Sequence, residues 1–127
     1  QFRLFTSPFT NAMRASGSMT VSSVIQSLCK YIFLGESIQA LITMSWTNGG
    51  SAHVANYCTL PFAAEASAVS ASNGHPAQVV NNAVQEVGVV RYFSKNEVEI
   101  YRYTGGNWSL AANQTYHEGF TFPIEIT

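Results

Sequence analysis

The stretch IQALITMSWTNGGSAHVANYCTL (Ile38–Leu60) contains two strand-like segments separated by an Asn-Gly-Gly triplet. Every second residue from Ile38 to Trp46 is apolar, which is the period of a strand with one buried face. Glycine adopts positive φ without steric cost, so the triplet Asn48-Gly49-Gly50 indicates a turn. We therefore predict a central β-hairpin in which 38–47 pairs with about 51–60 and Trp46 faces the core.

The rest of the chain shows further short alternating segments. We expect a second hairpin, 86–93 with 97–103, followed by a turn at 104–107, and strands at 18–24, 30–34 and 120–127. Pro123 lacks an N–H group, so the last strand is expected to be bulged or partly at an edge. An Ala-rich segment, 63–71, is expected to be a helix-like excursion over a sheet end. This pattern predicts an all-β fold, an antiparallel β-sandwich of about eight strands over 17–127, preceded by an apolar N-terminal arm, 1–16.

The composition excludes several function classes. The 127 residues suit one domain, and only 10% are charged, against about 25% in typical soluble proteins. The net charge of -1 leaves no basic patch for a nucleic acid. No apolar run is long enough to cross a bilayer, so we expect no membrane insertion.

Five short motifs carry a resemblance to a known family. They are Gly17-Ser18-Met19-Thr20-Val21-Ser22-Ser23, Tyr31-Ile32-Phe33-Leu34-Gly35, Thr47-Asn48-Gly49-Gly50-Ser51-Ala52, Thr59-Leu60-Pro61-Phe62 and Tyr101-Arg102-Tyr103-Thr104-Gly105-Gly106-Asn107-Trp108. Together they resemble short β-sandwich modules of tailed bacteriophages. The resemblance covers most of 17–108 and implies a virion protein, commonly trimeric, with a jelly-roll or tumour-necrosis-factor-like sandwich. Cys29, Cys58 and the arm depart from the pattern.

Apolar surface points to self-assembly. Several large side chains fall on strand faces opposite the expected core: Leu41, Tyr57, Val90, Tyr92, Tyr101 and Tyr103. A three-fold arrangement would bury one such face in each subunit, with Tyr57 and Tyr92 as expected contacts; the alternative is that these aromatics pair across strands. The arm carries five more large apolar residues: Phe2, Leu4, Phe5, Phe9 and Met13. We expect them to pack on a neighbouring subunit, the capsid or a fibre stem, or else to form the first strand of the same sandwich.

A carbohydrate site is the leading ligand hypothesis. Tyr101, Tyr103, Asn107 and Trp108 surround the glycine turn at 104–107 and form a plausible platform for a host glycan. The alternative for Trp108 is that it packs under the loop as a plug. The loops at 48–51 and 71–75 are other candidate tips.

Catalytic and metal constellations are weak. Glu97 and Glu99 lie on one strand face, where a solvated edge is the simpler interpretation than a glycosidase pair. Cys29 and Cys58 lack a motif that would orient them toward a histidine, and they are expected as a disulfide or as buried free thiols. The three histidines show no metal-ligand spacing. We therefore expect no enzyme activity, no cofactor and no metal site.

These observations predict a non-enzymatic phage virion protein, a homotrimeric surface module that attaches to the host at a fibre tip. A capsid decoration protein that clamps shell subunits through its arm is the first alternative. A free carbohydrate-binding module is the second.

Overall fold

The computed structural model describes residues 7–70 and 74–124, of which the side chains of Ser7, Ser70, Glu118 and Phe120 are not described. This part of the chain forms nine strands and one short helix: β1 (Ser7–Pro8), β2 (Met13–Ala15), β3 (Met19–Leu34), β4 (Ser37–Gly50), β5 (Ala55–Thr59), α1 (Ala66–Ser70), β6 (His75–Asn81), β7 (Val84–Tyr92), β8 (Glu97–Arg102) and β9 (Gln114–Pro123). All the strand pairs are antiparallel. The predicted all-β antiparallel fold is confirmed.

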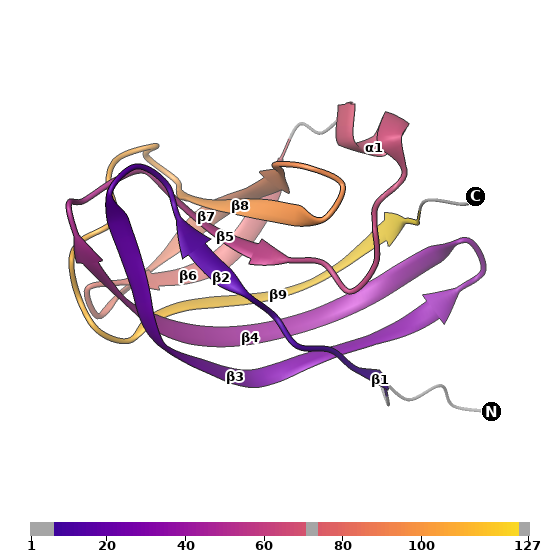
Figure 1. Cartoon of the computed structure of the whole chain (residues 1–127), viewed down its shortest axis with the longest axis horizontal. Coiled ribbons are helices and arrows are strands. Elements are labelled where there is room, and N and C mark those ends of the chain that lie inside the picture. Colours follow the sequence, from indigo (N-terminus) through magenta and orange to yellow (C-terminus); the bar gives the residue numbers. More distant parts are fainter. Residues whose placement is uncertain (1–6, 71–73, 125–127) are drawn as a thin grey trace.

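The nine strands form a single sheet in the order β1-β3-β4-β9-β6-β7-β8-β5-β2. β1 and β2 follow one another in the chain but lie at opposite edges of this sheet. Residues 9–12 therefore cross from one edge to the other, and the sheet curls until its edges approach each other. Figure 1 shows the result, in which β3, β4 and β9 form one layer and β5 and β8 lie across the core from them.

The core lies inside this curled sheet. Ile38, Ala40, Ile42, Met44 and Trp46 are buried along β4, so the predicted alternation and the core position of Trp46 are confirmed. Trp46 packs against Trp108, with ring centroids 5.7 Å apart. The alternation succeeds as a predictor here because β4 is a central strand with one face on the core.

The predicted central hairpin is wrong. Asn48-Gly49-Gly50 does not form the expected turn but ends β4, paired with 19–21 of β3. β4 pairs with β3 and β9, whereas the segment after 51–54 forms β5 and pairs with β8 and β2. The tight turn lies at Gly35-Glu36, where Leu34 pairs with Ser37 and Gly35 has a φ of 65°. A two-residue loop with positive φ matches strand twist, so β3 becomes the neighbour of β4.

The other expected elements have mixed outcomes. The hairpin of β7 and β8 is confirmed, and the segments 18–24 and 30–34 belong to one long strand, β3, interrupted by register shifts between Ser22 and Ile25 and between Gln26 and Leu28. The excursion expected at 63–71 contains α1, with residue 71 outside the described residues. Three residues of β9, 115–117, pair with β6. Pro123 ends β9 outside this paired part, where the strand has no β6 neighbour. Among the described residues, no helix has the length and apolar character to cross a membrane.

Two short strands replace the described part of the expected arm. β1 pairs with Tyr31 and Lys30 of β3, and β2 pairs with 56–58 of β5. Phe9 and Met13 pack against the core of the same chain. The alternative of a first strand in the same sandwich therefore describes 7–16 better than a free arm does. Phe2, Leu4 and Phe5 lie outside the described residues.

Candidate functional site

The outer face of β6, β7 and β8 is hollowed in three adjoining places. The first hollow, about 520 Å³, lies over β6 and β7 beside His117 of β9. The second, about 260 Å³, shares Pro76 and Val87 with it. The third, about 290 Å³, shares Val89 and Tyr103 with the second and reaches Arg91 and Tyr101. Because neighbouring hollows share lining residues, they form one open groove across the strands, which we call the outer trough.

Strand register sets the floor of the outer trough. Gln78 pairs with His117 on one side and with Val87 on the other, while Pro76 pairs with Val89 and Val89 pairs with Tyr101. Side chains on one face alternate along a strand, so these rows lie side by side on the outer face. The result is an apolar floor of valine and proline bordered by amide and aromatic groups.

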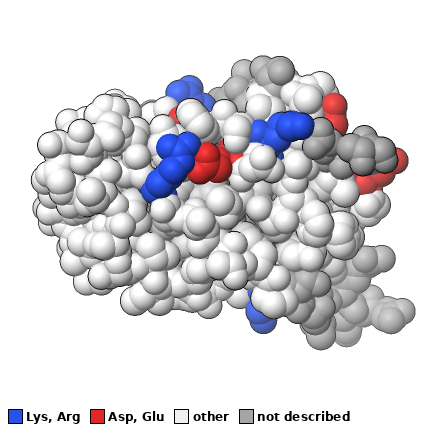
Figure 2. Space-filling model, viewed as in Figure 1, with Lys and Arg blue, Asp and Glu red and all other residues white. Residues whose placement is uncertain are grey.

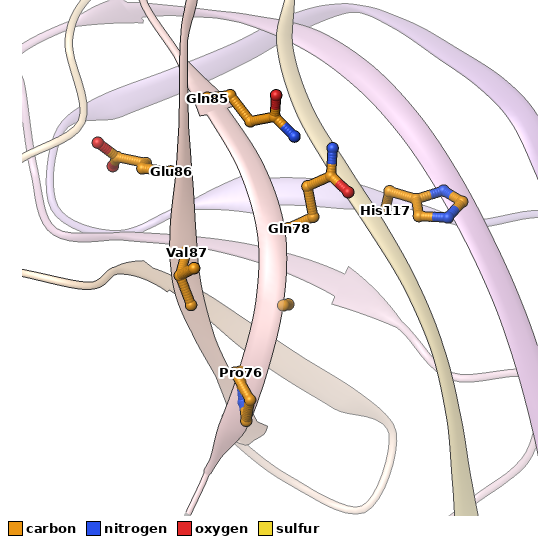
Figure 3. A pocket seen from close by; sticks show the side chains of 7 residues that line it. Pro76, Gln78, Gln85, Glu86, Val87 and His117 are labelled. Carbon is orange, nitrogen blue, oxygen red and sulfur yellow. The ribbon is translucent and has the colours of Figure 1, made fainter.

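Polar groups lie at the β9 end of the outer trough. Figure 3 shows the amide groups of Gln78 and Gln85 turned toward each other, with His117 beyond them and Glu86 turned the other way. Nδ1 of His117 lies 2.6 Å from Oγ1 of Thr43, so the imidazole is tied to β4. Glu86 instead pairs with Arg102 at 2.7 Å between Oε1 and Nε. The polar side chains at this end are therefore two amides and one imidazole, and the nearby carboxylate is paired with an arginine.

A closed polar cluster borders the other end. Nε of Arg91 lies 2.7 Å from Oε1 of Glu99, Nη2 of Arg91 donates to the hydroxyl of Tyr101 at 3.1 Å, and this hydroxyl donates to Oε2 of Glu99 at 2.8 Å. Burial raises the pKa of Tyr101, and hydrogen bonds to Tyr101 and Glu99 raise the pKa of Arg91. Tyr101 and Arg91 keep their protons at neutral pH, and the positive charge of Arg91 is balanced by the negative charge of the Glu99 carboxylate.

Tyr103 stands between the second and third hollows and is 73% exposed. It follows β8 directly, on the turn at 104–107 that the sequence predicts, where Gly105 has a φ of 73°. Nη1 of Arg102 donates to the backbone carbonyl of Asn107 at 2.9 Å and ties the base of this turn to Glu86. The ring of Tyr103 is therefore exposed to solvent beside a turn whose base is held by hydrogen bonds.

The expected ligand residues have different positions. Tyr101 and Tyr103 line the outer trough, and Asn107 is exposed on the neighbouring turn. Trp108 is fully buried and its Nε1 donates to the carbonyl of Ile100 at 3.3 Å. The prediction of a glycan contact at Trp108 is therefore wrong, because the indole is a core residue beneath the loop.

Several expected assembly residues are covered by this chain itself. Tyr57 is buried, with the guanidinium of Arg14 4.1 Å from its ring centre and Phe93 4.8 Å away. Val90 is fully buried and Tyr92 packs against the core, so their expected outward placement is wrong. On β7 the odd-numbered residues face outward instead, and two of them, Gln85 and Val87, are exposed and line the first hollow.

A cluster of exposed aromatics was not predicted. Tyr31, Phe33 and Phe62 lie with ring centroids 5.2 to 5.6 Å apart, and Phe9 lies 6.2 Å from Tyr31. Phe33 and Phe62 are 44% and 40% exposed. We call Phe9, Tyr31, Phe33 and Phe62 the aromatic cluster. Tyr31 and Phe33 pair with Ala40 and Ile38, which are buried, so both rings lie on the core side of β3. The signal for this placement is the alternation of the two aromatic residues in the segment 30–34.

The two glutamates and two cysteines considered as catalytic candidates have the following surroundings. Glu97 forms two hydrogen bonds with Arg14, at 2.8 and 2.9 Å, and Glu99 belongs to the cluster at the end of the outer trough. Cys29 and Cys58 are buried free thiols. Across 7–70 and 74–124 no group of three or more His, Cys, Asp or Glu side chains is placed to hold a metal ion.

Comparisons with models of protein families, with curated proteins and with solved structures gave no match. The resemblance of 17–108 to phage modules therefore stays an expectation from sequence motifs, and the function of the chain is a proposal.

Proposed function

We propose that this chain is a non-enzymatic surface module of a phage virion, which assembles as a homotrimer through the aromatic cluster and attaches to the host through the outer trough. The observation that carries the proposal is the exposed Tyr103 directly after β8, which lines two of the three hollows on the outer sheet face. A rigid platform with an exposed aromatic and fixed polar neighbours is suited to binding rather than to catalysis.

The distribution of charge supports a role in assembly. In Figure 2, basic and acidic groups lie together in the upper half of the view, over β2, β5 and β8, and most of the remaining surface is uncharged. Three of the arginines are engaged in ion pairs: Arg14 with Glu97, Arg91 with Glu99, and Arg102 with Glu86. A surface with so few unpaired charges does little to repel another copy of the same chain.

The aromatic cluster is the best candidate contact between copies. It joins three separate parts of the chain, the segment after β1, the end of β3, and the loop after β5, and it lies beside the N-terminal segment through the pairing of β1 with Tyr31. Aromatic side chains are enriched in the buried centre of protein interfaces. This placement also leaves the outer trough, on β6 to β8, available to a ligand.

The assembly is tested by light scattering of the purified chain and of the variant F33S/F62S, with Leu110→Ser as the matched control, because Leu110 is 49% exposed outside the cluster. We expect the wild type and the control to have three times the mass of one chain, and the double variant to have the mass of one. A wild-type monomer at high concentration would contradict the trimer.

Attachment is tested with the fluorescently labelled trimer on a panel of bacterial strains. We expect saturable binding to some strains that Tyr103→Ala weakens and Leu110→Ser leaves unchanged. A stable trimer that binds phage capsids and no cells would favour the decoration protein instead. A monomer that binds cells through Tyr103 would favour a free carbohydrate-binding module.

A further inference from the structure

The chemistry of the outer trough narrows the class of its ligand. Its lining combines an apolar floor, Pro76, Val87 and Val89, with the amides of Gln78 and Gln85 at one end and the ring of Tyr103 toward the other. Amide groups offer both donors and acceptors, which matches hydroxyl groups, and an exposed aromatic ring packs well against an apolar flat surface. A sugar ring has both features, hydroxyls at its rim and C–H groups on its faces.

Charge at the trough is balanced. Arg91 is paired with Glu99 and hydrogen-bonded to Tyr101, while Arg102 and Glu86 neutralise each other. An acidic ligand would have to displace Glu99 from Arg91, losing a bond of 2.7 Å. The same pairing leaves no arginine available to a phosphate backbone at this face. The trough therefore favours an uncharged ligand.

The middle of the trough offers no open strand edge. Peptides that add to a sheet need such an edge for their backbone hydrogen bonds. β6 has a strand partner on both sides at 78–80, β7 at 88–90 and β8 at 98–101, whereas 75–77 of β6 and 84–87 of β7 each have a partner on one side. A ligand on this face is bound by side chains, and it crosses the strands because the three hollows succeed one another from β9 to β8. Three strand spacings of about 4.8 Å give a path of about 14 Å, which suits a chain of several linked rings.

From these observations we propose that the outer trough binds a neutral oligosaccharide of three or more sugar units, with one unit stacked on Tyr103 and another hydrogen-bonded to Gln78 and Gln85. This inference rests on the proposed attachment function and gives the class of its ligand. Glycan binding at an open groove gains affinity along the chain, because each occupied hollow adds contacts.

The test uses the full chain in isothermal titration calorimetry. The probes are neutral hexose and N-acetylhexosamine oligomers of two to six units and, as a second set, oligomers of the same lengths that contain uronic acid. We expect binding of at least one neutral series, with affinity that rises from two units to about four and then levels off. Binding only by the acidic set, or by no member of either set, would overturn the proposal.

Variants locate the site. Tyr103→Ala and the double variant Q78A/Q85A are each expected to weaken binding of the best neutral oligomer about tenfold, the loss of one stacking or hydrogen-bonding contact of about 1.4 kcal/mol. Tyr103→Phe keeps the ring and is expected to stay within about twofold of the wild type. Phe93→Ala is the matched control, because Phe93 is a 50% exposed aromatic that lies outside the three hollows.

Failure of this inference differs from failure of the proposed function. If Tyr103→Ala abolishes attachment to cells but no neutral oligomer binds, the trough attaches to another receptor and only the ligand class is wrong. If neutral oligomers bind but cell attachment does not depend on Tyr103, the ligand class is right and the attachment function is wrong. Equal weakening by Phe93→Ala and Tyr103→Ala would contradict the location of the site.

Discussion

Asn48 and Asn56 form a reciprocal pair of amide hydrogen bonds inside the core. Nδ2 of Asn48 donates to Oδ1 of Asn56 at 2.7 Å, and Nδ2 of Asn56 donates to Oδ1 of Asn48 at 3.2 Å. Both residues are buried, one at the end of β4 and the other in β5. β4 and β5, which follow one another in the chain, are thus joined by side chains, although their backbones pair with other strands.

Asn48 is expected to matter more for stability than Asn56. Oδ1 of Asn48 also accepts from Nε1 of Trp46 at 3.1 Å, and its Nδ2 lies 3.3 Å from the carbonyl of Thr20. Asn48→Ala leaves several buried groups without partners and should lower the free energy of unfolding by about 3 kcal/mol, against about 1 to 2 for Asn56→Ala. Urea denaturation measures both, with the exposed Asn107→Ala as control. A smaller loss for Asn48→Ala than for Asn56→Ala would contradict this ranking.

The predicted hairpin failed because the sequence shows strands more clearly than it shows their partners. The alternation along 38–47 correctly indicates a strand, but the turn expected at 48–50 is wrong, because these residues continue β4 and pair with 19–21 of β3. The chain leaves the strand after Gly50, which has a φ of 75°. Partner choice depends on longer-range contacts. The tight turn at Gly35-Glu36 makes β3 one neighbour of β4. The other neighbour is β9, which lies near the end of the sequence.

Both tryptophans are expected to report on the core and not on the ligand. Trp46 and Trp108 are each 1% exposed or less. The native emission should therefore be blue-shifted and resist quenching by acrylamide, and an oligosaccharide that saturates the outer trough should leave it unchanged. Trp108→Ala should cost about 3 to 5 kcal/mol of stability. Acrylamide quenching of the native protein as strong as in urea would contradict the burial of Trp108.

The candidate site was only half visible in the sequence. Tyr101 and Tyr103 could be placed near the glycine turn because they are its close neighbours along the chain. Gln78 comes from β6, a strand that the alternation pattern did not reveal. The hairpin of β6 with β7 turns at Asn82 and Ala83, which have positive φ values of 52° and 66°. The turn contains no glycine, so the sequence gives little sign of it. Sites built by cross-strand register need the partners of each strand, which one sequence does not supply.

The two thiols are expected to be inert in the native protein. Burial raises the pKa of Cys29 to about 11 and that of Cys58 to about 12. At pH 8 their thiolate fractions are about a hundredfold or more below that of a free cysteine with a pKa of about 8.5. Dithionitrobenzoate should therefore label the folded chain slowly and the chain in urea at once. Fast labelling of two thiols without urea would contradict the structure.

The same shifts predict a loss of stability in alkali. A group with a raised pKa in the folded state stabilises the fold fully below its unfolded pKa, here about 8.5, and this contribution is lost as pH rises toward the folded pKa. For Cys58 that window ends at about 12. Cys58→Ala lacks the titrating group, so the stability advantage of the wild type over this variant should shrink from pH 9 to pH 11. Parallel stability curves for the two proteins would contradict the shift.

Asn11 is expected to hold β3 and β5 together close to Cys58. Its backbone N–H donates to Oε1 of Gln26 in β3 at 2.7 Å, while its side chain donates to the carbonyl of Thr59 at 2.9 Å and accepts from the N–H of Thr59 at 2.8 Å. The hydroxyl of Thr59 also donates to Oδ1 of Asn11 at 3.3 Å, and Asn11→Ala removes all three side-chain bonds to β5, at a cost of about 1 to 3 kcal/mol.

The opening caused by this change should be local. Since β2 pairs Met13 with Cys58, release of 9–15 from β5 uncovers the thiol without unfolding the rest of the sheet. We expect Asn11→Ala to speed labelling of Cys58 about ten- to a hundredfold, the range that corresponds to this loss of free energy, and Asn107→Ala to leave the labelling rate unchanged. Labelling rates measured at several urea concentrations distinguish local from global opening. The slope of the logarithm of the rate against urea concentration increases with the surface that the opening exposes. A slope as steep as that of global unfolding would contradict an edge that opens by itself.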